Sequence, residues 1–345
     1  MTNPKTSILI IYTGGTIGMI EDAQSGALKT FNFDHLFNEI PELKKYNLRI
    51  ASFSFDPLID SSNMNPSNWI KIASTIKENY QAYDGFVILH GSDTMAYTAS
   101  ALSFMLENLA KPVILTGSQL PIGVIRTDGK ENLLTAIEIA AAQKDGKPMV
   151  PEVCIYFENN LYRGNRTHKF NAENFSAFIS ANYPSLAKVG VHIRYNHQAI
   201  LSPKINFLIV HSQLDQNIAI LKLFPGINQT VVDATLQING LKAVILETYG
   251  SGNAPTDSWF LNSLENAIKK GIIVLNITQC KGGSVVQGKY ETSSDSLKIG
   301  VTGGVDMTTE AAITKLMYLL GENFSTEEVK KLLSISLRGE LSEEN

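Results

Sequence analysis

The fold is decided by the stretch Ile8-Leu9-Ile10-Ile11-Tyr12-Thr13-Gly14-Gly15-Thr16-Ile17-Gly18. Its apolar start predicts a short buried strand. The two glycines end that strand and leave the hydroxyl of Thr16 at its carboxyl end. Open α/β sheets place their binding and catalytic groups at the carboxyl ends of strands. Thr16 is therefore a candidate catalytic residue.

A second predicted strand, residues 85–90, ends in a similar way, in Gly91-Ser92-Asp93-Thr94. It adds the hydroxyl of Ser92, with the carboxylate of Asp93 beside it. Glycine at the end of a strand is also a common answer to a backbone that needs positive φ, so neither loop is decisive alone. Together, two hydroxyls at the ends of two strands indicate nucleophilic catalysis.

Short β-branched runs alternate with helical patterns from residue 7 to about 160, which is typical of a doubly wound, mostly parallel sheet. The periodicity fades over residues 195–217, and a second α/β alternation follows. We therefore expect two α/β domains: a larger N-terminal domain over 1–194 that carries the catalytic residues, a linker over 195–217, and a smaller C-terminal domain over 218–345.

The expected elements follow from apolar spacing and from Gly, Pro and Asn signals. The expected strands after the first are 48–53, 85–90, 112–116, 152–157, 218–223, 243–246 and 272–278. The expected helices are one that begins at Asn65-Pro66 and those over 94–109, 129–143, 256–269, 309–320 and 325–334. Residues 21–30 are small and polar, and we expect them to form a mobile loop over the site.

The composition and charge of the chain indicate which kinds of binding partner to expect. The chain has 345 residues, 44% of them hydrophobic, and a formal net charge of −4 without runs of like charge. The sequence therefore shows no basic run that would bind nucleic acid or an anionic membrane, and we expect a small-molecule substrate. We find no signal-peptide core and no apolar run of about 18 residues. The two cysteines, Cys154 and Cys280, lie in apolar segments, so we expect buried thiols and a cytoplasmic protein.

The base that would activate a hydroxyl is not obvious among the six histidines. The chain has no Gly-x-Ser-x-Gly elbow and neither His-Glu-x-x-His nor Cys-x-x-Cys, so a hydrolase triad of that type and a metal site are not expected. Lysine remains: Lys169 follows two arginines in the polar, hairpin-like stretch 162–169, and burial or cationic neighbours can make a lysine basic. A lysine in such a stretch is most often a solvated charge.

A nucleotide loop is the main alternative for the first glycines. Thr13-Gly14 with Gly18 approaches the Thr-Gly-x-x-x-Gly-x-Gly pattern of short-chain dehydrogenases, but Ile20 occupies the last glycine position. The chain also has no Tyr-x-x-x-Lys pair, so the proton-transfer half of that NAD(P) chemistry is missing.

Several segments together closely resemble the bacterial type I, cytoplasmic L-asparaginases, and the resemblance spans essentially the whole chain. They are Thr13-Gly14-Gly15-Thr16-Ile17-Gly18, Asp60-Ser61-Ser62, His90-Gly91-Ser92-Asp93-Thr94-Met95-Ala96-Tyr97, Thr116-Gly117-Ser118-Gln119, Tyr162-Arg163-Gly164-Asn165-Arg166 with Lys169, and Leu337-Arg338-Gly339-Glu340-Leu341. The resemblance implies an amidohydrolase that converts L-asparagine to L-aspartate and ammonia through an acyl-enzyme, without a cofactor or metal.

The resemblance also implies roles for the catalytic residues. Thr16 is the expected nucleophile, and Ser92, Asp93 and Lys169 form a second, proton-handling triad in which Lys169 acts as the base of Ser92. Asp93 would orient Lys169 and pair with the α-ammonium of the substrate.

The implied substrate-binding residues are Asp93 and four serines: Ser61, Ser62, Ser92 and Ser118. Ser61 and Ser62 would hold the substrate α-carboxylate through hydroxyl and N–H groups, and Ser118 would contact the amide end. The segment Tyr249-Gly250-Ser251-Gly252-Asn253 would approach the site of a neighbouring subunit, so we expect a homodimer or a dimer of dimers.

Three departures from the family pattern matter. Ser92 stands where relatives often have Thr, which gives the hydroxyl more rotamer freedom. Gly26-Ala27-Leu28 offers no tyrosine where many relatives have one near the nucleophile. Glu247 replaces an arginine that serves a regulatory asparagine site in some type I enzymes, so that regulation is not expected here.

Two other functions stay open on the same fold. A non-catalytic amino-acid sensor would keep Ser61, Ser62 and Asp93 but would not need Thr16 or Lys169. An asparaginase-like subunit of a tRNA-dependent amidotransferase would need an RNA-binding domain or basic stripe, which the sequence does not show.

Overall fold

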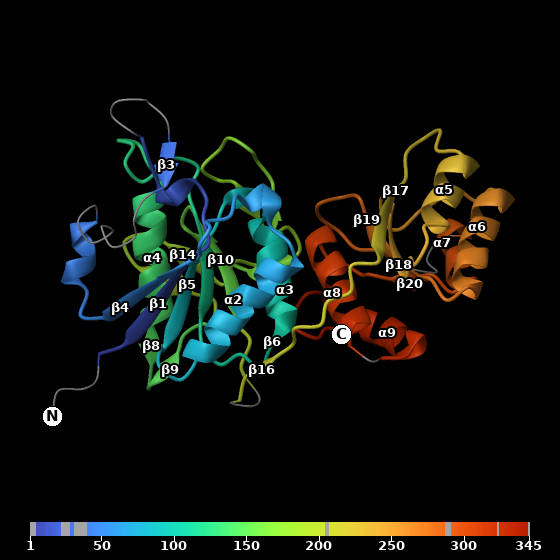
Figure 1. The fold of residues 1–345 in the computed structure, drawn as a ribbon. Helices are drawn as coiled ribbons and strands as arrows, with labels where there is room; N and C mark the ends of the chain where they lie inside the picture. The colour runs from blue at the N-terminus through green and yellow to red at the C-terminus, as the bar shows by residue number, and fades with distance from the viewer. Residues whose placement is uncertain are drawn as a thin grey trace. The chain divides into compact units, whose positions relative to one another are not determined.

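The computed structural model describes residues 5–21, 28–30, 40–203, 207–286, 291–322 and 324–343. The chain forms two compact units (Figure 1). Unit 1 contains Met1–Ser180 and Pro184–Ser212, and unit 2 contains Ala181–Tyr183 and Gln213–Asn345. Within the described ranges, we find no helix that is both long and apolar enough to cross a membrane.

Unit 1 is built on an eight-stranded sheet with the order β15-β14-β11-β10-β7-β5-β1-β4. The five strands from β10 to β4 are parallel, and β11, β14 and β15 add antiparallel pairs. The bounds are β1 Ser7–Tyr12, β4 Arg49–Ser54, β5 Gly85–Leu89, β7 Val113–Thr116, β10 Val153–Phe157, β11 Asn160–Arg163, β14 Ala187–Val189 and β15 Ile193–Tyr195. All residues of β1, β5, β7 and β10 are buried, as expected for a sheet covered on both faces.

Helices cover both faces of this sheet: α4 (Gly129–Ala141) lies on one face, and α2 (Pro66–Asn79) and α3 (Met95–Met105) lie on the other (Figure 1). The α2 helix begins as its sequence predicts, with the Asn65 side chain accepting a hydrogen bond from the Asn68 N–H and a proline in the first turn.

The expected helix over 94–109 is too long. It ends at Met105, because Leu106–Glu107 forms the short strand β6, which pairs with β16 (Ile209–Val210). Similarly, α4 ends two residues before its predicted limit, and Gln143–Lys144 begins a small hairpin, β8, with β9 (Lys147–Pro148).

Short elements complete unit 1. They are η1 Thr16–Gly18, β2 Met19–Glu21, β3 Leu28–Thr30, η3 Pro41–Lys45, η4 Ser61–Asn63, η5 Ser92–Thr94, η6 Gly164–Arg166, β12 His168–Lys169 and β13 Phe178–Ile179. Strands β2 and β3 pair antiparallel at the two ends of the expected loop 21–30. Residues 22–27 lie outside the described residues.

Unit 2 is a four-stranded parallel sheet with the order β17-β18-β19-β20. Its strands are β17 Ile218–Lys222, β18 Ala243–Thr248, β19 Ile273–Thr278 and β20 Thr302–Gly303; its helices are α5 Gln229–Leu236, α6 Ser258–Lys269, α7 Glu291–Lys298, α8 Thr309–Gly321 and α9 Thr326–Leu333. Helices α5 and α6 lie on one face of the sheet, and α8 lies on the other (Figure 1). Apolar side chains of α5, α6, β18 and β19 form one core, including Val232, Phe260, Leu264, Val244 and Val274.

The sequence analysis missed two helices of unit 2, α5 and α7. Polar residues interrupt the apolar pattern of both.

The expectation that both cysteines are buried was wrong for one of them. Cys154 is buried in β10, whereas Cys280 is exposed, because it lies beyond the end of β19 at Thr278.

Candidate active site

The ends of β1 and β5 meet through two glycines. A Cβ atom on Gly15 would lie 2.5 Å from the backbone nitrogen of Gly91, closer than real Cβ atoms approach. Gly15 has φ 92° and ψ 168°, a conformation that is essentially restricted to glycine. Thr16 and Ser92 directly follow these glycines, so this contact places the backbones of the two candidate residues close together.

Ser92, Asp93 and Lys169 form one hydrogen-bonded cluster, although 76 residues separate the lysine from the aspartate. The Lys169 ammonium donates to Asp93 Oδ1 at 2.6 Å and to Ser92 Oγ at 2.9 Å. The Lys169 side chain is 17% exposed and that of Asp93 is 65% exposed. The carboxylate therefore binds the lysine on one side and faces solvent, where a substrate ammonium could bind, on the other.

Lys169 reaches this cluster from a buried support. Strand β12 pairs antiparallel with β13, and η6 before it packs against α3 at a close contact between Gly164 and Ala99. The hairpin-like stretch that contains Lys169 is thus not a solvated basic loop. Its Arg163 is 3% exposed and donates to Glu152, at 2.7 Å from Nε.

The expected carboxylate-binding serines lie in η4, beside this cluster. Ser61 is buried, its Oγ lies next to Gly91, and its carbonyl accepts from Thr94 Oγ1 at 2.7 Å. Ser62 is exposed, and both its N–H and its hydroxyl donate to Asp60 Oδ1 at 2.9 Å. These two donors must exchange Asp60 for the substrate if Ser62 is to bind a carboxylate.

Ser118 follows β7 at the same edge of the sheet. It is 3% exposed, and its hydroxyl has no hydrogen-bond partner among the described residues. A buried hydroxyl without a partner is costly. The geometry thus leaves Ser118 able to bind a group that enters the site.

A relay of buried hydrogen bonds, which the sequence analysis missed, supports the same loop. Trp69 Nε1 donates to Thr98 Oγ1 at 3.0 Å, Thr98 Oγ1 lies 2.9 Å from His90 Nε2, and His90 Nδ1 lies 2.7 Å from Gly91 O. An indole N–H can only donate and a carbonyl can only accept. Thr98 therefore donates to Nε2, His90 carries its proton on Nδ1, and the carbonyl of Gly91 is held beneath the site.

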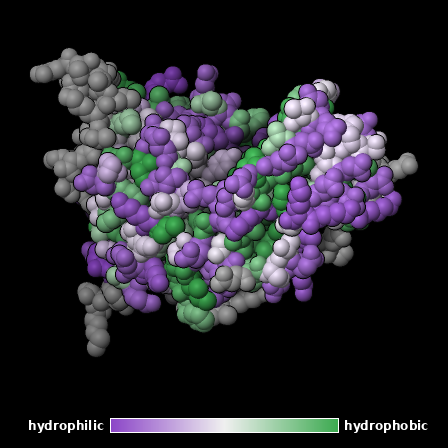
Figure 2. Space-filling view, turned by 45° about the vertical axis from the view of Figure 1, so that its right-hand side comes forward, coloured by the Kyte–Doolittle hydropathy of each residue, from purple (hydrophilic) through white to green (hydrophobic). Residues whose placement is uncertain are grey.

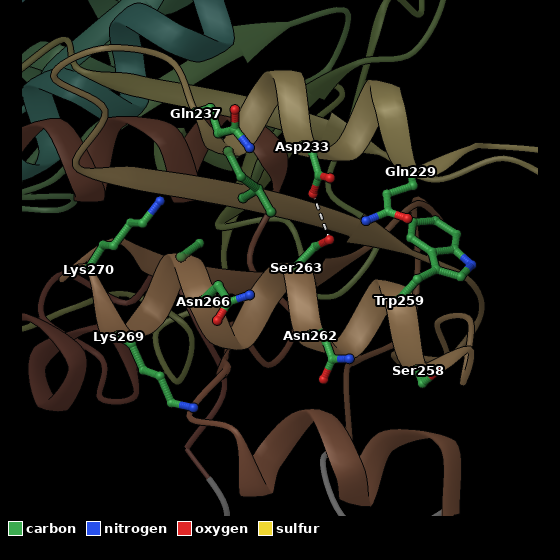
Figure 3. A pocket seen from close by; sticks show the side chains of 12 residues that line it. Gln229, Asp233, Gln237, Ser258, Trp259, Asn262, Ser263, Asn266, Lys269 and Lys270 are labelled. Atoms are coloured by element: carbon green, nitrogen blue, oxygen red, sulfur yellow. Dashed lines mark hydrogen bonds between the residues drawn. The ribbon is translucent and has the colours of Figure 1, made fainter.

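Two features of unit 2 take no part in this cluster. Glu247, which replaces the family arginine, accepts from Thr309 Oγ1 at 2.8 Å and lies 3.4 Å from Lys222 Nζ. A hollow of about 580 Å³ between α5 and α6 is lined by amide, hydroxyl, charged and apolar side chains, and Ser263 donates to Asp233 across it at 2.6 Å (Figure 3). At Glu247 the hydroxyl of Thr309 and the ammonium of Lys222 both contact the carboxylate, whereas in unit 1 the lysine contacts both the hydroxyl and the carboxylate.

Two family models of known proteins match the N-terminal and C-terminal parts of this chain. The family model "Asparaginase, N-terminal" matches residues 7–201, and the model "Glutaminase/Asparaginase C-terminal domain" matches residues 217–333. The chain therefore belongs to the asparaginase family, and its two α/β units are the fold of that family.

The similar proteins cover nearly the whole chain. L-asparaginase 1 of Escherichia coli (strain K12) is 46% identical over 339 residues, 98% of each chain. The crystal structure of L-asparaginase I from Vibrio cholerae is 43% identical, with a TM-score of 0.89, and covers 98% of this chain and 100% of its own. The thermostable L-asparaginase from Thermococcus kodakarensis also has a TM-score of 0.89, at 31% identity and with coverage of 98% and 100%.

The buried His90 predicts a pH dependence of stability. Burial lowers the pKa of His90 from 6.5 to about 4, so between these values the unfolded chain binds a proton at this residue and the folded protein does not. The free energy of unfolding should fall by about 3 kcal/mol as the pH drops from 6.5 to 4. The apparent thermal midpoint across this range measures it.

His90→Gln should flatten this part of the pH profile, whereas His192→Gln, at an exposed histidine, should leave it unchanged. Equal slopes in the parent protein and His90→Gln would show that the relay does not hold His90 neutral.

Proposed function

We propose that this protein hydrolyses L-asparagine to L-aspartate and ammonia. The observation that carries the proposal is the Ser92–Asp93–Lys169 cluster, next to Thr16 at the contact between Gly15 and Gly91. The full-length similarity to enzymes named L-asparaginase supports the same substrate. A family member that bound an amino acid only as a sensor would have no need for a lysine held against a hydroxyl and a carboxylate.

In the proposed reaction, Thr16 Oγ1 attacks the side-chain amide carbon of asparagine. The carbon–nitrogen bond breaks, ammonia leaves with the proton from the nucleophile, and an aspartyl ester remains on Thr16. Water then attacks the ester, releases aspartate and returns a proton to Thr16. Ser92 and Lys169 handle these protons, since they are hydrogen-bonded to each other at the edge of the sheet where Thr16 lies.

Substrate binding follows from the remaining groups. The exposed side of Asp93 pairs with the α-ammonium, a charge-assisted contact. Ser61 and Ser62 bind the α-carboxylate, and the buried hydroxyl of Ser118 binds at the amide end, where negative charge develops on the carbonyl oxygen. These groups suit an amino acid that carries a side-chain amide.

Substitutions in the cluster should separate binding from turnover. Thr16→Ala should abolish ester formation. Lys169→Met should lower kcat by about 10² to 10⁴, the usual effect of losing a general base, and leave aspartate binding largely intact. Asp93→Ala should impair both, because one carboxylate orients the lysine and binds the substrate. Ammonia release from asparagine and from glutamine, with aspartate binding by calorimetry, measures each variant.

Lys188→Met, at an exposed lysine of β14, is the matched control and should behave as the parent protein. Near-parental turnover of Lys169→Met would refute the assignment of the base. Aspartate binding without ammonia release by the parent protein would favour the sensor.

We also propose that the enzyme is a cytoplasmic homodimer or dimer of dimers. Tyr249 and Asn253 close a tight turn in unit 2, with the Tyr249 N–H donating to Asn253 O at 2.9 Å and Gly250 O accepting from Thr278 Oγ1 at 2.6 Å. Such a stiff turn suits contact with a neighbouring subunit. Apolar groups also reach the surface on the face shown in Figure 2.

Analytical ultracentrifugation with simultaneous assay tests this assembly. The active species should sediment as a dimer or tetramer. A fully active monomer would contradict the proposal.

A further inference from the structure

Gln119 lies beside the catalytic cluster and makes contacts that the proposed reaction does not use. Its backbone N–H donates to both carboxylate oxygens of Asp128, at 3.1 and 3.0 Å. Its side-chain nitrogen donates to the carbonyls of Ala172 and Asn174, at 3.1 and 3.0 Å. Both ends of the residue are therefore anchored.

These contacts fix the orientation of the amide. Backbone carbonyls can only accept hydrogen bonds, so the NH₂ group of Gln119 must face Ala172 and Asn174. The oxygen Oε1 consequently faces Ser92, where the Oγ-to-Oε1 distance is 3.3 Å. An amide oxygen can only accept, so the hydroxyl of Ser92 donates to Gln119.

The direction of this bond sets the proton order of the cluster. A serine hydroxyl has a single hydrogen, and here it points to Gln119. The Ser92 oxygen is thereby left to accept from the Lys169 ammonium at 2.9 Å. In the resting site the order of donation is therefore Lys169 to Ser92 to Gln119.

We propose that Gln119 is a positioning residue that holds the side chain of Ser92 in its productive rotamer. A serine side chain has three staggered rotamers, whereas a β-branched threonine is stiffer at χ1. Gln119 gives this chain the restraint that a threonine methyl group would supply. The assignment rests on the proposed function, because it concerns the hydroxyl that handles protons in that reaction.

The loop that receives the Gln119 amide is shaped for this contact. The Asn171 side-chain oxygen accepts from the N–H groups of Glu173 and Asn174, both at 2.8 Å. These bonds turn the backbone so that the carbonyls of Ala172 and Asn174 converge on one amide. The restraint on Ser92 thus depends on Asn171 as well.

A double-mutant cycle tests the proposal. Gln119→Met removes the amide at similar length and should lower kcat for asparagine about threefold, since one rotamer of three remains productive, with KM changed less than about twofold. The same substitution in a Ser92→Thr background should cost less than about twofold, because the threonine restrains itself. Gln143→Met, at an exposed glutamine of β8, is the control and should change nothing.

The rescue separates positioning from a purely structural role. If Gln119 served only to hold the 171–174 loop, Gln119→Met would cost the same with serine or threonine at position 92, and the proposal would be overturned. Asn171→Ala should reproduce part of the loss of kcat. Asn171→Asp, which keeps the acceptor, should not.

A crystal structure of the Gln119→Met variant gives a readout that does not depend on activity. Ser92 should occupy more than one rotamer in the variant and one in the parent. A single, unchanged rotamer of Ser92 in the variant would overturn the positioning role, even if the parent protein releases no ammonia. If the rotamers are as expected but the parent protein releases no ammonia, only the proposed function is overturned.

Discussion

The close approach of two backbones, at Gly15 and Gly91, is the constraint on which the rest of the site depends. Side chains normally hold loops several ångströms apart, but here a Cβ atom on Gly15 would lie 2.5 Å from a backbone nitrogen, which cannot move aside like the end of a flexible side chain. Only glycine permits both this distance and the backbone conformation at residue 15. Two strands that are neighbours in the sheet thereby bring the residues that follow them, Thr16 and Ser92, close together in the backbone.

The site is also organised by hydrogen bonds that allow one direction of donation. One chain of bonds runs from Trp69 to the carbonyl of Gly91, and another runs from Lys169 to the amide of Gln119. In each resting chain, with Lys169 as the ammonium, a donor stands at one end and an oxygen that can only accept stands at the other. Dipoles fixed before the substrate arrives need no reorganisation during the reaction, which is the usual source of electrostatic catalysis in enzymes.

Sequence reasoning predicted much of the fold because the elements near the site carry strong local signals. The apolar run before Gly14 and the Asn65 N-cap each specify a structure within a few residues. The helix end at Met105 could not be predicted in this way, because a strand about 100 residues later in the chain pairs with the residues that follow it. Helices α5 and α7 were missed because their polar residues obscure the helical period.

In the candidate site, too, local sequence signals predicted some residues, and the others depend on contacts between distant parts of the chain. Thr16 and Ser92 were predicted because they follow the ends of strands, whereas Lys169 needed a family resemblance, since nothing local distinguishes it from a solvated lysine. Gln119 lay inside a segment that was recognised, but its role depends on the direction of hydrogen bonds to a loop more than 50 residues away. Such information exists only in three dimensions.

The most direct test of the account is the kcat/KM for asparagine of Gly15→Ala, compared with Gly190→Ala, where a Cβ atom meets open space. Gly15→Ala should lose at least about 100-fold, because a displacement of about 1 Å can misplace reacting groups to that extent, and Gly190→Ala should retain parental activity. Parental activity in Gly15→Ala would contradict the claim that the contact between the two glycines builds the site.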